Sequence, residues 1–584
     1  MYAKLVEVYS GRRKVHKIVY LRLMKRVKVN GIWKERVVAN LGRQDVMGRK
    51  VLGELVKKLR RFSDEILVTP EEIESGCARD YGSVLVGQKL WQEIGLDRWI
   101  WDACGSPHSG SLGEPGILAM VLNRLCCPKS KLALSDWMST VYLPVWQTKG
   151  FELSEKAEVF AERFYRTMDW LVKGKSKEKI EDRIASWART LFPVDVVFYD
   201  ITNVQFEGWQ KLKQARHGYI RLGRKNHEQI LLGLVMIEGL PLGAHIFRGN
   251  RAEKRTLWWV CNKIKKQFPV GRIIYVCDRG MITESNLSEI ESGEDGYIVA
   301  LKRRRCVEVE PLLEQVPAEW TPIKQSKQGD VLLSAWEAAE EAGKRRVVVY
   351  NPIKAQEEKD KRSSVIQELQ EQLEELGRNG TKSKGKKKKK GFKALIAAAE
   401  KILSHKHGKR YLTYSVKEDG QFEFTLNREN LSKEEKLDGK FVIKTTEKNL
   451  SLKEVVFKYK DLADIEDGFR DLKDFIRVAP VFHWRYRRVK AHIFICVLAL
   501  LLERYLEQKM HKAGLNISAR KVIEKLKNIK VVTNRVGPLT LKYVTPPNQE
   551  LEKLLMVCGI YKLPKILNES IERLKKVQTQ VQNS

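Results

Sequence analysis

The segments VDVVFYD (194–200) and RIIYVCD (272–278) decide the fold of this 584-residue chain. Each is rich in β-branched and aromatic residues, as buried strands are, and each ends in an aspartate where turn residues follow. Between them lie two further strand patterns, QILLGLVMIEG and LPLGAHIFRGN, and one helical pattern, KRTLWWVCNKIKKQF. A helix, TESNLSEIES, and a strand, GYIVALK, come next. The predicted order is β-β-β-α-β-α-β.

This order predicts an α/β fold with a mixed sheet of the ribonuclease H type. Three strands joined by hairpins come first, and helical crossovers lead to the later strands. In such a sheet the first strand is central and pairs with the strand that follows the first helix. Asp200 and Asp278 are therefore expected to be neighbours, although 78 residues separate them in the sequence.

A third acid, Glu466, lies inside the helical pattern YKDLADIEDGFRDLK (459–473). Tyr459 precedes it by seven residues and Lys473 follows it by seven, so a continuous helix would place all three on one face. Arg470, four residues after Glu466, would share that face. An ordinary Glu466–Arg470 salt bridge is the simpler interpretation of Arg470.

Three carboxylates meeting at a sheet edge are a means of binding divalent metal. Mg²⁺ prefers oxygen ligands and leaves coordination positions open for phosphate and water. A pair of such ions would also compensate the free-energy cost of burying the charges of Asp200, Asp278 and Glu466. Each acid also has a plain structural interpretation. Asp200 would be a turn residue, Asp278 a helix cap and Glu466 an exposed helical acid.

Composition favours a polyanionic partner. The chain has 108 Lys and Arg against 73 Asp and Glu, a formal net charge of +35, and the surplus is spread along its length. Ribosome-associated and thermophilic proteins are also basic, so charge alone does not identify nucleic acid. The nine cysteines form no Cys-x-x-Cys pair, and the longest apolar run, 491–502, falls short of a membrane span. We expect a cytoplasmic protein.

Changes of pattern along the chain divide it into six predicted regions. Short Trp-rich helices in the second suit a DNA-binding module and a plain helical scaffold almost equally. A lysine run at 382–391, in the fourth, is expected to be a mobile surface loop. The regions are a hairpin-plus-helix module (1–75), a helical, DNA-binding region (76–192), the first part of the core (193–302), an insertion domain (303–447), the second part of the core with the Glu466 helix (448–512) and a helical extension (513–584).

The quoted motifs resemble those of DDE transposases of prokaryotic insertion sequences. The branch is the one with a Tyr-x2-Arg-x3-Glu-x6-Lys signature, and the insertion-sequence 1634 group is the most similar. The matching stretches are YDITNVQFEG, YVCDRGMIT, YKDLADIEDGFRDLK and RVAPVFHWRYRRVKAHIFICVLALLLE. The chain departs from the signature at Leu462, where Arg is expected, so Lys460 or Arg470 is left to make that phosphate contact.

The resemblance implies a transposase that cuts at the terminal inverted repeats of its element and joins the ends to target DNA. Asp200, Asp278 and Glu466 would hold two Mg²⁺ ions, for which Mn²⁺ would substitute, and Tyr459, Arg470 and Lys473 would contact DNA. The partners implied are double-stranded DNA and further copies of the chain on paired ends, in the prokaryotic nucleoid. A DNA-binding relative without catalysis and a nuclease that cuts without joining remain alternatives.

Overall fold

The computed structural model of the protein describes residues 2–567, apart from 11–15, 30–31, 60–72, 149–155, 193–195, 207–211, 213, 218–227, 252–253, 268–271, 279–282, 305–306, 316, 318, 327, 342, 381–387, 418–420 and 537–538. The chain divides into two units. Unit 1 consists of Met1–Gly82, Lys527–Glu552 and Ile560–Ser584, and unit 2 consists of Ser83–Leu526 and Lys553–Gly559.

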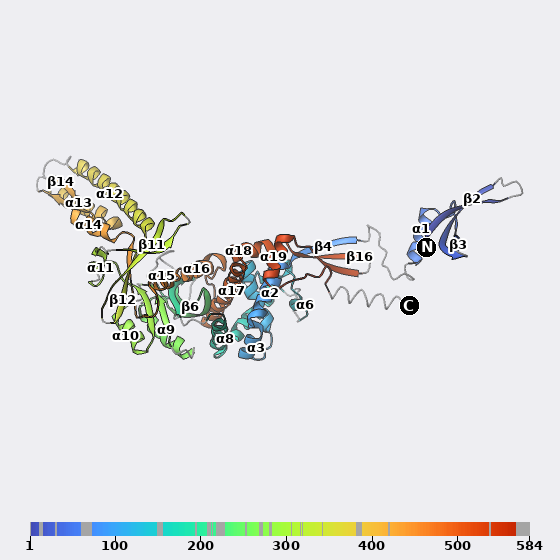
Figure 1. The fold of residues 1–584 in the computed structure, drawn as a ribbon, viewed down its shortest axis with the longest axis horizontal. Coiled ribbons are helices and arrows are strands. Elements are labelled where there is room, and N and C mark those ends of the chain that lie inside the picture. The colour runs from blue at the N-terminus through green and yellow to red at the C-terminus, as the bar shows by residue number, and fades with distance from the viewer. Residues whose placement is uncertain are drawn as a thin grey trace. The chain divides into compact units, whose positions relative to one another are not determined.

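Unit 1 contains two antiparallel sheets among its described residues (Figure 1). The hairpin and helix predicted within 1–75 are confirmed as β2, β3 and α1, but β1 was missed, and 30–31, between β2 and β3, lie outside the described residues. The bounds are β1 (Tyr2–Ser10), β2 (His16–Val29), β3 (Ile32–Arg43) and α1 (Arg49–Leu59) in one part, and β4 (Ile73–Asp80), β16 (Lys530–Val536) and β17 (Leu539–Val544) in the other.

Helices α2 to α8 form the first part of unit 2, as the Trp-rich patterns predict. In α4 every residue from Ile117 to Leu122 is at most 2% exposed, because α7 and the long helix α17 (Tyr486–Lys512) pack against it. Whether this region is a domain of its own stays a prediction. The bounds are α2 (Gly82–Ile94), α3 (Leu96–Cys104), α4 (Gly113–Cys126), α5 (Leu134–Thr140), α6 (Pro144–Thr148), α7 (Ala157–Leu171) and α8 (Ser176–Leu191).

A nine-stranded mixed sheet is the centre of unit 2, with the strand order β10-β11-β12-β15-β9-β8-β5-β6-β7. Strands β5, β8 and β9 are parallel, and the other neighbours pair antiparallel. The predicted order β-β-β-α-β-α-β and the pairing of its first strand with the strand after the first helix are confirmed. The bounds are β5 (Val196–Gln205), β6 (Gln229–Ile237), β7 (Leu240–Arg248), α9 (Lys254–Gln267), β8 (Ile274–Cys277), α10 (Glu284–Ser292) and β9 (Gly296–Ala300).

The β7 edge of this sheet is covered by α8. Glu181 accepts a hydrogen bond from the backbone N–H of Ala244 at 3.0 Å, and Lys177 donates to the carbonyl oxygen of the same residue at 3.0 Å. Both side chains are buried and paired with each other. They satisfy edge groups that would otherwise be open to another strand.

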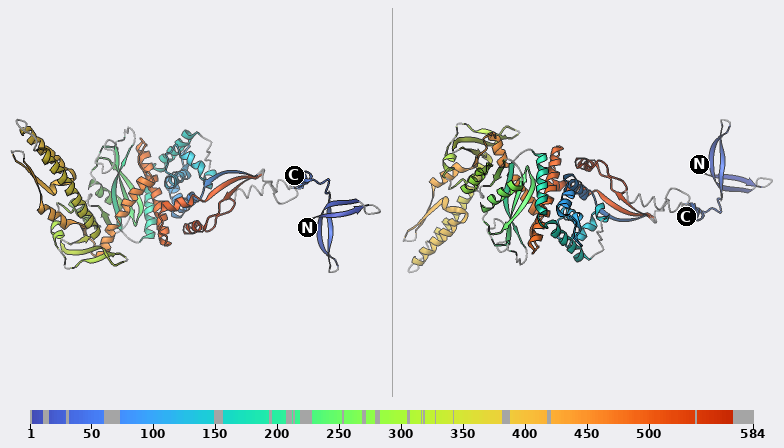
Figure 2. Two further views of the ribbon diagram at one scale, coloured as in Figure 1. Left: turned by 90° about the horizontal axis from the view of Figure 1, so that it is seen from above. Right: turned by 90° about the horizontal axis from the view of Figure 1, so that it is seen from below.

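Residues of the predicted insertion extend the sheet. Strands β10 to β12 and β15 lengthen it beyond β9, while α12 and α13 lie side by side, drawn in yellow to orange in Figure 2. Helix α13 already begins at Lys388, so the prediction of a surface loop over 382–391 is wrong for 388–391, and 381–387 lie outside the described residues. The bounds are α11 (Glu310–Glu314), β10 (Thr321–Gln325), β11 (Val331–Glu341), β12 (Lys344–Tyr350), α12 (Pro352–Gly380), α13 (Lys388–Ser404), η4 (His405–Arg410), β13 (Leu412–Val416), β14 (Phe422–Leu426), α14 (Arg428–Leu437) and β15 (Lys440–Thr445).

The single helix predicted through 459–473 is wrong, because the chain turns at Asp461 and Leu462. Backbone hydrogen bonds there run from residue i+3 to residue i, as from Ile465 N–H to the Leu462 carbonyl oxygen at 3.1 Å. This tightening keeps Leu462 and Ile465 buried, so the apolar spacing does not reveal it. The bounds are α15 (Leu452–Lys460), α16 (Ala463–Arg470), the π-helical turn η5 (Asp471–Phe475), α18 (Ala519–Leu526) and α19 (Gln549–Val557).

Helix α17 is buried over most of its length, as its apolar sequence predicts. It packs on α4 and β7. Among the described residues, none of the helices has the length and apolarity needed to span a membrane.

Candidate functional site

Asp200 and Asp278 lie at matching positions on neighbouring parallel strands. The ladder pairs Phe198 with Val276 and Tyr199 with Cys277, so the next residue on each chain is the predicted aspartate. Neighbouring strands are about 4.8 Å apart. The sheet therefore brings these two predicted site residues together, at the point where β8 ends and β5 continues to Gln205.

The pKa of the Cys277 thiol is affected by the charges of both carboxylates. Burial raises its pKa to about 12, and the negative charges of Asp278 and Asp200 add to that rise. Both aspartates are half-buried, whereas Cys277 is fully buried. The edge of the sheet is thus electronegative and lies over an apolar layer, which is an environment suited to a bound cation.

Helix α16 covers the face of the sheet onto which Asp200 projects. Asp200 is the cross-strand partner of Leu234, so both side chains lie on one face. A Cβ placed on Gly468 would lie 3.7 Å from Leu234 Cδ2 and 3.4 Å from Met236 Sδ. Helix α16 therefore packs on β6 at Gly468, two residues from the third predicted acid.

Glu466 is exposed on α16, in its first turn. In the part of the chain that the structure describes, no three His, Cys, Asp or Glu side chains lie together closely enough to hold a metal ion. The aspartate pair fits a divalent cation in ligand chemistry and position. Glu466 does not complete a three-acid group with them, so the metal site over all three acids stays a prediction.

Lys473 reaches the same face from the turn η5. Its Nζ donates to Thr202 Oγ1 at 2.5 Å. Partial burial lowers the pKa of Lys473, while the carboxylates of Asp474 and Asp200 act in the opposite direction. An ammonium group therefore lies within electrostatic reach of Asp200, where it can bind a phosphate oxygen.

Tyr459 does not share a helical face with Glu466, because the predicted helix is broken at Asp461 and Leu462. Arg470 lies four residues after Glu466 on the same helix, α16, and so does share its face. Tyr459 lies on α15, half-buried, with its ring 5.7 Å from that of Phe441. Arg470 lies on α16 and forms an exposed ion pair with Asp467 at 2.7 Å, in place of the salt bridge to Glu466 considered from the sequence. Their role in contacting DNA stays a prediction.

Leu462, the departure from the expected arginine, is 7% exposed and packs into the core. Nearby, burial lowers the pKa of Lys460, and the positive charges of Lys324 and Lys354 lower it further. The basic group formed by these three lysines was missed, because Lys324 and Lys354 lie in the insertion, more than 100 residues earlier. Only the folded chain brings them together.

Thr202 was also missed, although a signal for it exists. It follows Asp200 by two residues, and side chains two apart on a strand lie on the same face. The motif YDIT therefore places a hydroxyl beside the first aspartate.

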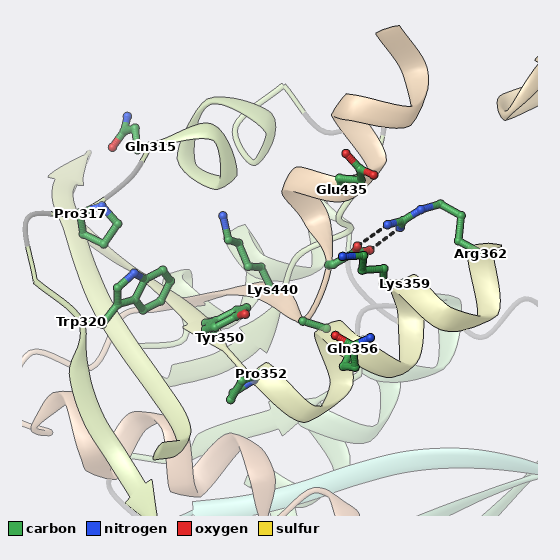
Figure 3. Close-up of a pocket in the computed structure, with 12 residues that line it drawn as sticks. Gln315, Pro317, Trp320, Tyr350, Pro352, Gln356, Lys359, Arg362, Glu435 and Lys440 are labelled. Atoms are coloured by element: carbon green, nitrogen blue, oxygen red, sulfur yellow. Dashed lines mark hydrogen bonds and ion pairs between the residues drawn. The ribbon is translucent and has the colours of Figure 1, made fainter. Parts of the chain in front are cut away.

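A pocket of about 530 Å³ lies elsewhere on the sheet, at the end of β12 (Figure 3). Trp320 and Tyr350 line one side, with their ring centroids 5.5 Å apart. On the other side, Arg362 binds both oxygens of Asp438, at 2.7 and 2.6 Å. The pocket includes none of the predicted site residues, so it is separate from the aspartate pair.

No curated protein sequence matches the chain. Among solved structures, the chain is similar to a piggyBac transposase, from a cryo-EM structure of its synaptic complex with hairpin DNA. The sequence identity is 8%, the similarity covers 87% of this chain and 88% of that one, and the TM-score is 0.36.

The family model described as "Transposase DDE domain" matches residues 195–502. That segment is more than half of the 584 residues. It contains the aspartate pair, Glu466 and Lys473. The chain therefore belongs to the transposase DDE-domain family, whose members carry out DNA transposition.

Proposed function

We propose that this transposase moves an insertion sequence by a cut-and-paste route. It would cleave DNA at the terminal inverted repeats of its element and join the freed ends to target DNA. The observation that carries the proposal is the alignment of Asp200 and Asp278 at matching positions of β5 and β8, on a face covered by α16. We assign the core to the ribonuclease H-like folds on the order and pairing of its strands.

The carboxylates of Asp200, Asp278 and Glu466 would hold two Mg²⁺ ions. Such ions supply Lewis-acid stabilisation of the attacking and leaving oxygens of an in-line phosphoryl displacement. Exposed on α16, Glu466 would have to move towards the aspartate pair when DNA and metal bind. Lys473, held by Thr202, would turn its ammonium group from that hydroxyl to a phosphate oxygen near the scissile bond.

DNA contacts would continue from this centre to further residues of unit 2. Tyr459, Arg470 and Lys473 are the residues that the family signature indicates. Because Leu462 is buried, we assign the phosphate contact of the missing arginine to Lys460, whose neighbours Lys324 and Lys354 reinforce its attraction for phosphate.

The wider proposal concerns partners and source. The helical region 76–192 would read the terminal repeats, and two or more copies of the chain would hold the paired ends. The resemblance of the signature motifs supports a source among prokaryotic insertion-sequence transposases, with the 1634 group as the most similar. It would then act on nucleoid DNA in the cytoplasm.

The test is an incubation of the full chain with Mg²⁺ and DNA that carries the ends of its own element. Glu466→Gln is the inactive variant, and Asp467→Asn is its matched control, since Asp467 is the next residue of the same helix. Cleaved and joined products from wild type and Asp467→Asn, but not from Glu466→Gln, are expected. Binding without cleavage would favour a non-catalytic relative, and cleavage without joining a nuclease.

A further inference from the structure

The turn that follows Lys473 has a backbone conformation that needs external support. The Ile476 N–H donates to the Asp471 carbonyl oxygen at 2.8 Å, and the Val478 N–H donates to the Leu472 carbonyl oxygen at 2.8 Å. Arg477, between them, has a φ of 56°, in the left-handed region that residues with a side chain seldom adopt. Such a conformation persists only where the surroundings hold it.

Arg124 provides that support from α4, more than 300 residues away in the sequence. Its guanidinium donates to the carbonyl oxygens of Ile476 at 3.3 Å and of Arg477 at 3.0 Å, and its other end donates to Lys129 at 3.2 Å. The side chain is 8% exposed. The two terminal nitrogens of the rigid guanidinium fork thus bind the turn and the Lys129 carbonyl oxygen at once, and the single nitrogen of an ammonium group has no such fork.

Two side chains of α17 hold the ends of the same turn. Arg504 forms an ion pair with Asp471, where η5 begins, and His492 donates from Nε2 to the Val478 carbonyl oxygen at 3.0 Å. Arg124 therefore binds the middle of a turn that is fixed at both ends. Lys473 projects from this turn to Thr202, beside the aspartate pair.

We propose that Arg124 is a positioning residue of the transposition centre. It holds the left-handed turn at Arg477 and thereby keeps Lys473 directed at the face that carries Asp200 and Thr202. It does not touch DNA or metal itself, so its effect on the reaction passes through Lys473. This inference rests on the role proposed above for Lys473 as a phosphate contact.

The test is a double-mutant cycle with Arg124→Lys, Lys473→Ala and the two changes combined. Arg124→Lys keeps the charge but has a single nitrogen, so it cannot bind the turn and the Lys129 carbonyl oxygen together. We expect cleavage of bound DNA by Arg124→Lys to fall about tenfold, with little change in affinity for the DNA end. In the Lys473→Ala background the same change should have no further effect. Equal losses in both backgrounds would show that Arg124 does not act through Lys473 and would overturn the inference.

Arg345→Lys is the matched control. Arg345 is also buried and donates to two carbonyl oxygens, those of Glu447 and Leu450, each at 2.6 Å, but it does not contact the turn. It should lower the melting temperature without coupling to Lys473. A coupling to Lys473 as large as that of Arg124 would show that the cycle reports general destabilisation, and would overturn the inference.

A second measurement does not require activity. Hydrogen exchange of the backbone amides of Ile476 and Val478, followed by mass spectrometry, reports opening of the turn. Arg124→Lys and Arg124→Gln should both speed this exchange, and Arg345→Lys should not. Unchanged exchange in both Arg124 variants would overturn the inference. If wild type binds its DNA ends but does not cleave them, the proposed function fails, and amide exchange alone then tests whether Arg124 holds the turn.

Discussion

Two parts of the candidate site are held by different kinds of interaction. Asp200 and Asp278 belong to a ladder of backbone hydrogen bonds between β5 and β8, inside a sheet of nine strands. Glu466 and Lys473 belong to α16 and η5, two short pieces whose place depends on a glycine contact and on side chains from other helices. The sheet part is thus fixed by backbone pairing, and the helix part can be moved by single side chains.

The largest effect is expected from a change to the sheet part. Asp200→Asn or Asp278→Asn removes one negative charge and leaves the backbone hydrogen bonds between β5 and β8 intact. The rate of cleavage should fall about 10³-fold, because several kcal/mol of transition-state stabilisation are lost. Thermal melts and affinity for the DNA ends, measured beside cleavage, should change little. Asp136→Asn, at an exposed acid of α5, is the control. Full cleavage by either aspartate variant would remove that residue from the site.

A change to the helix part alone should have the next largest effect. Leu in place of Gly468 cannot fit between α16 and the side chains of Leu234 and Met236, and overpacking of this kind costs about 1–3 kcal/mol. Gly468→Leu should therefore displace Glu466 and slow cleavage about 10-fold to 100-fold, while the sheet stays intact by circular dichroism.

Gly468→Ala is the matched control for that change. Its Cβ meets only the end of Met236 and a methyl group of Leu234, at 3.4 and 3.7 Å, and the methionine side chain can adjust. Cleavage by Gly468→Ala should stay within about threefold of wild type, since helix propensity offsets the tighter packing. If Gly468→Leu also cleaves normally, the approach of α16 to β6 is not what places Glu466.

A substitution at Glu503 tests how α17 supports the helix part, through the change in the free energy of unfolding. This side chain of α17 is 3% exposed, and burial, together with the charges of Asp471 and Glu507, raises its pKa to about 9. Between its usual pKa of 4.5 and about 9, the folded state keeps a proton that the unfolded state releases, so stability falls as pH rises through that window. Glu503→Gln removes this dependence.

The expected result is a gain of at least about 1 kcal/mol in the free energy of unfolding at pH 8, and no gain near pH 4. Denaturant titrations at the two pH values measure it. Glu507→Gln is the control, because Glu507 forms an ion pair with Arg504 at 3.2 Å and its loss should bring no gain. An equal gain at both pH values would contradict a buried, protonated Glu503.

The same difference explains how far the sequence could lead. Strand order and the pairing of β5 with β8 follow from alternating and apolar runs and from the rule for crossovers, and these bring Asp200 to Asp278. The break at Asp461 could not be predicted, since a tightened turn preserves the apolar spacing of Leu462 and Ile465. Long-range contacts, such as Arg124 with the turn after Lys473, leave no local pattern.

The smallest expected effect concerns the phosphate contact assigned to Lys460. Its neighbours Lys324 and Lys354 share its charge, whereas Lys458 on the same helix is ion-paired with Glu238 at 2.8 Å. If Lys460 binds a phosphate, Lys460→Ala should reduce the slope of log affinity against log salt by about one. Lys458→Ala should leave the slope unchanged. Equal slopes for wild type and Lys460→Ala would show that Lys460 does not bind a phosphate. The phosphate contact expected of the missing arginine would then be assigned to Arg470 on α16, in the helix part of the site.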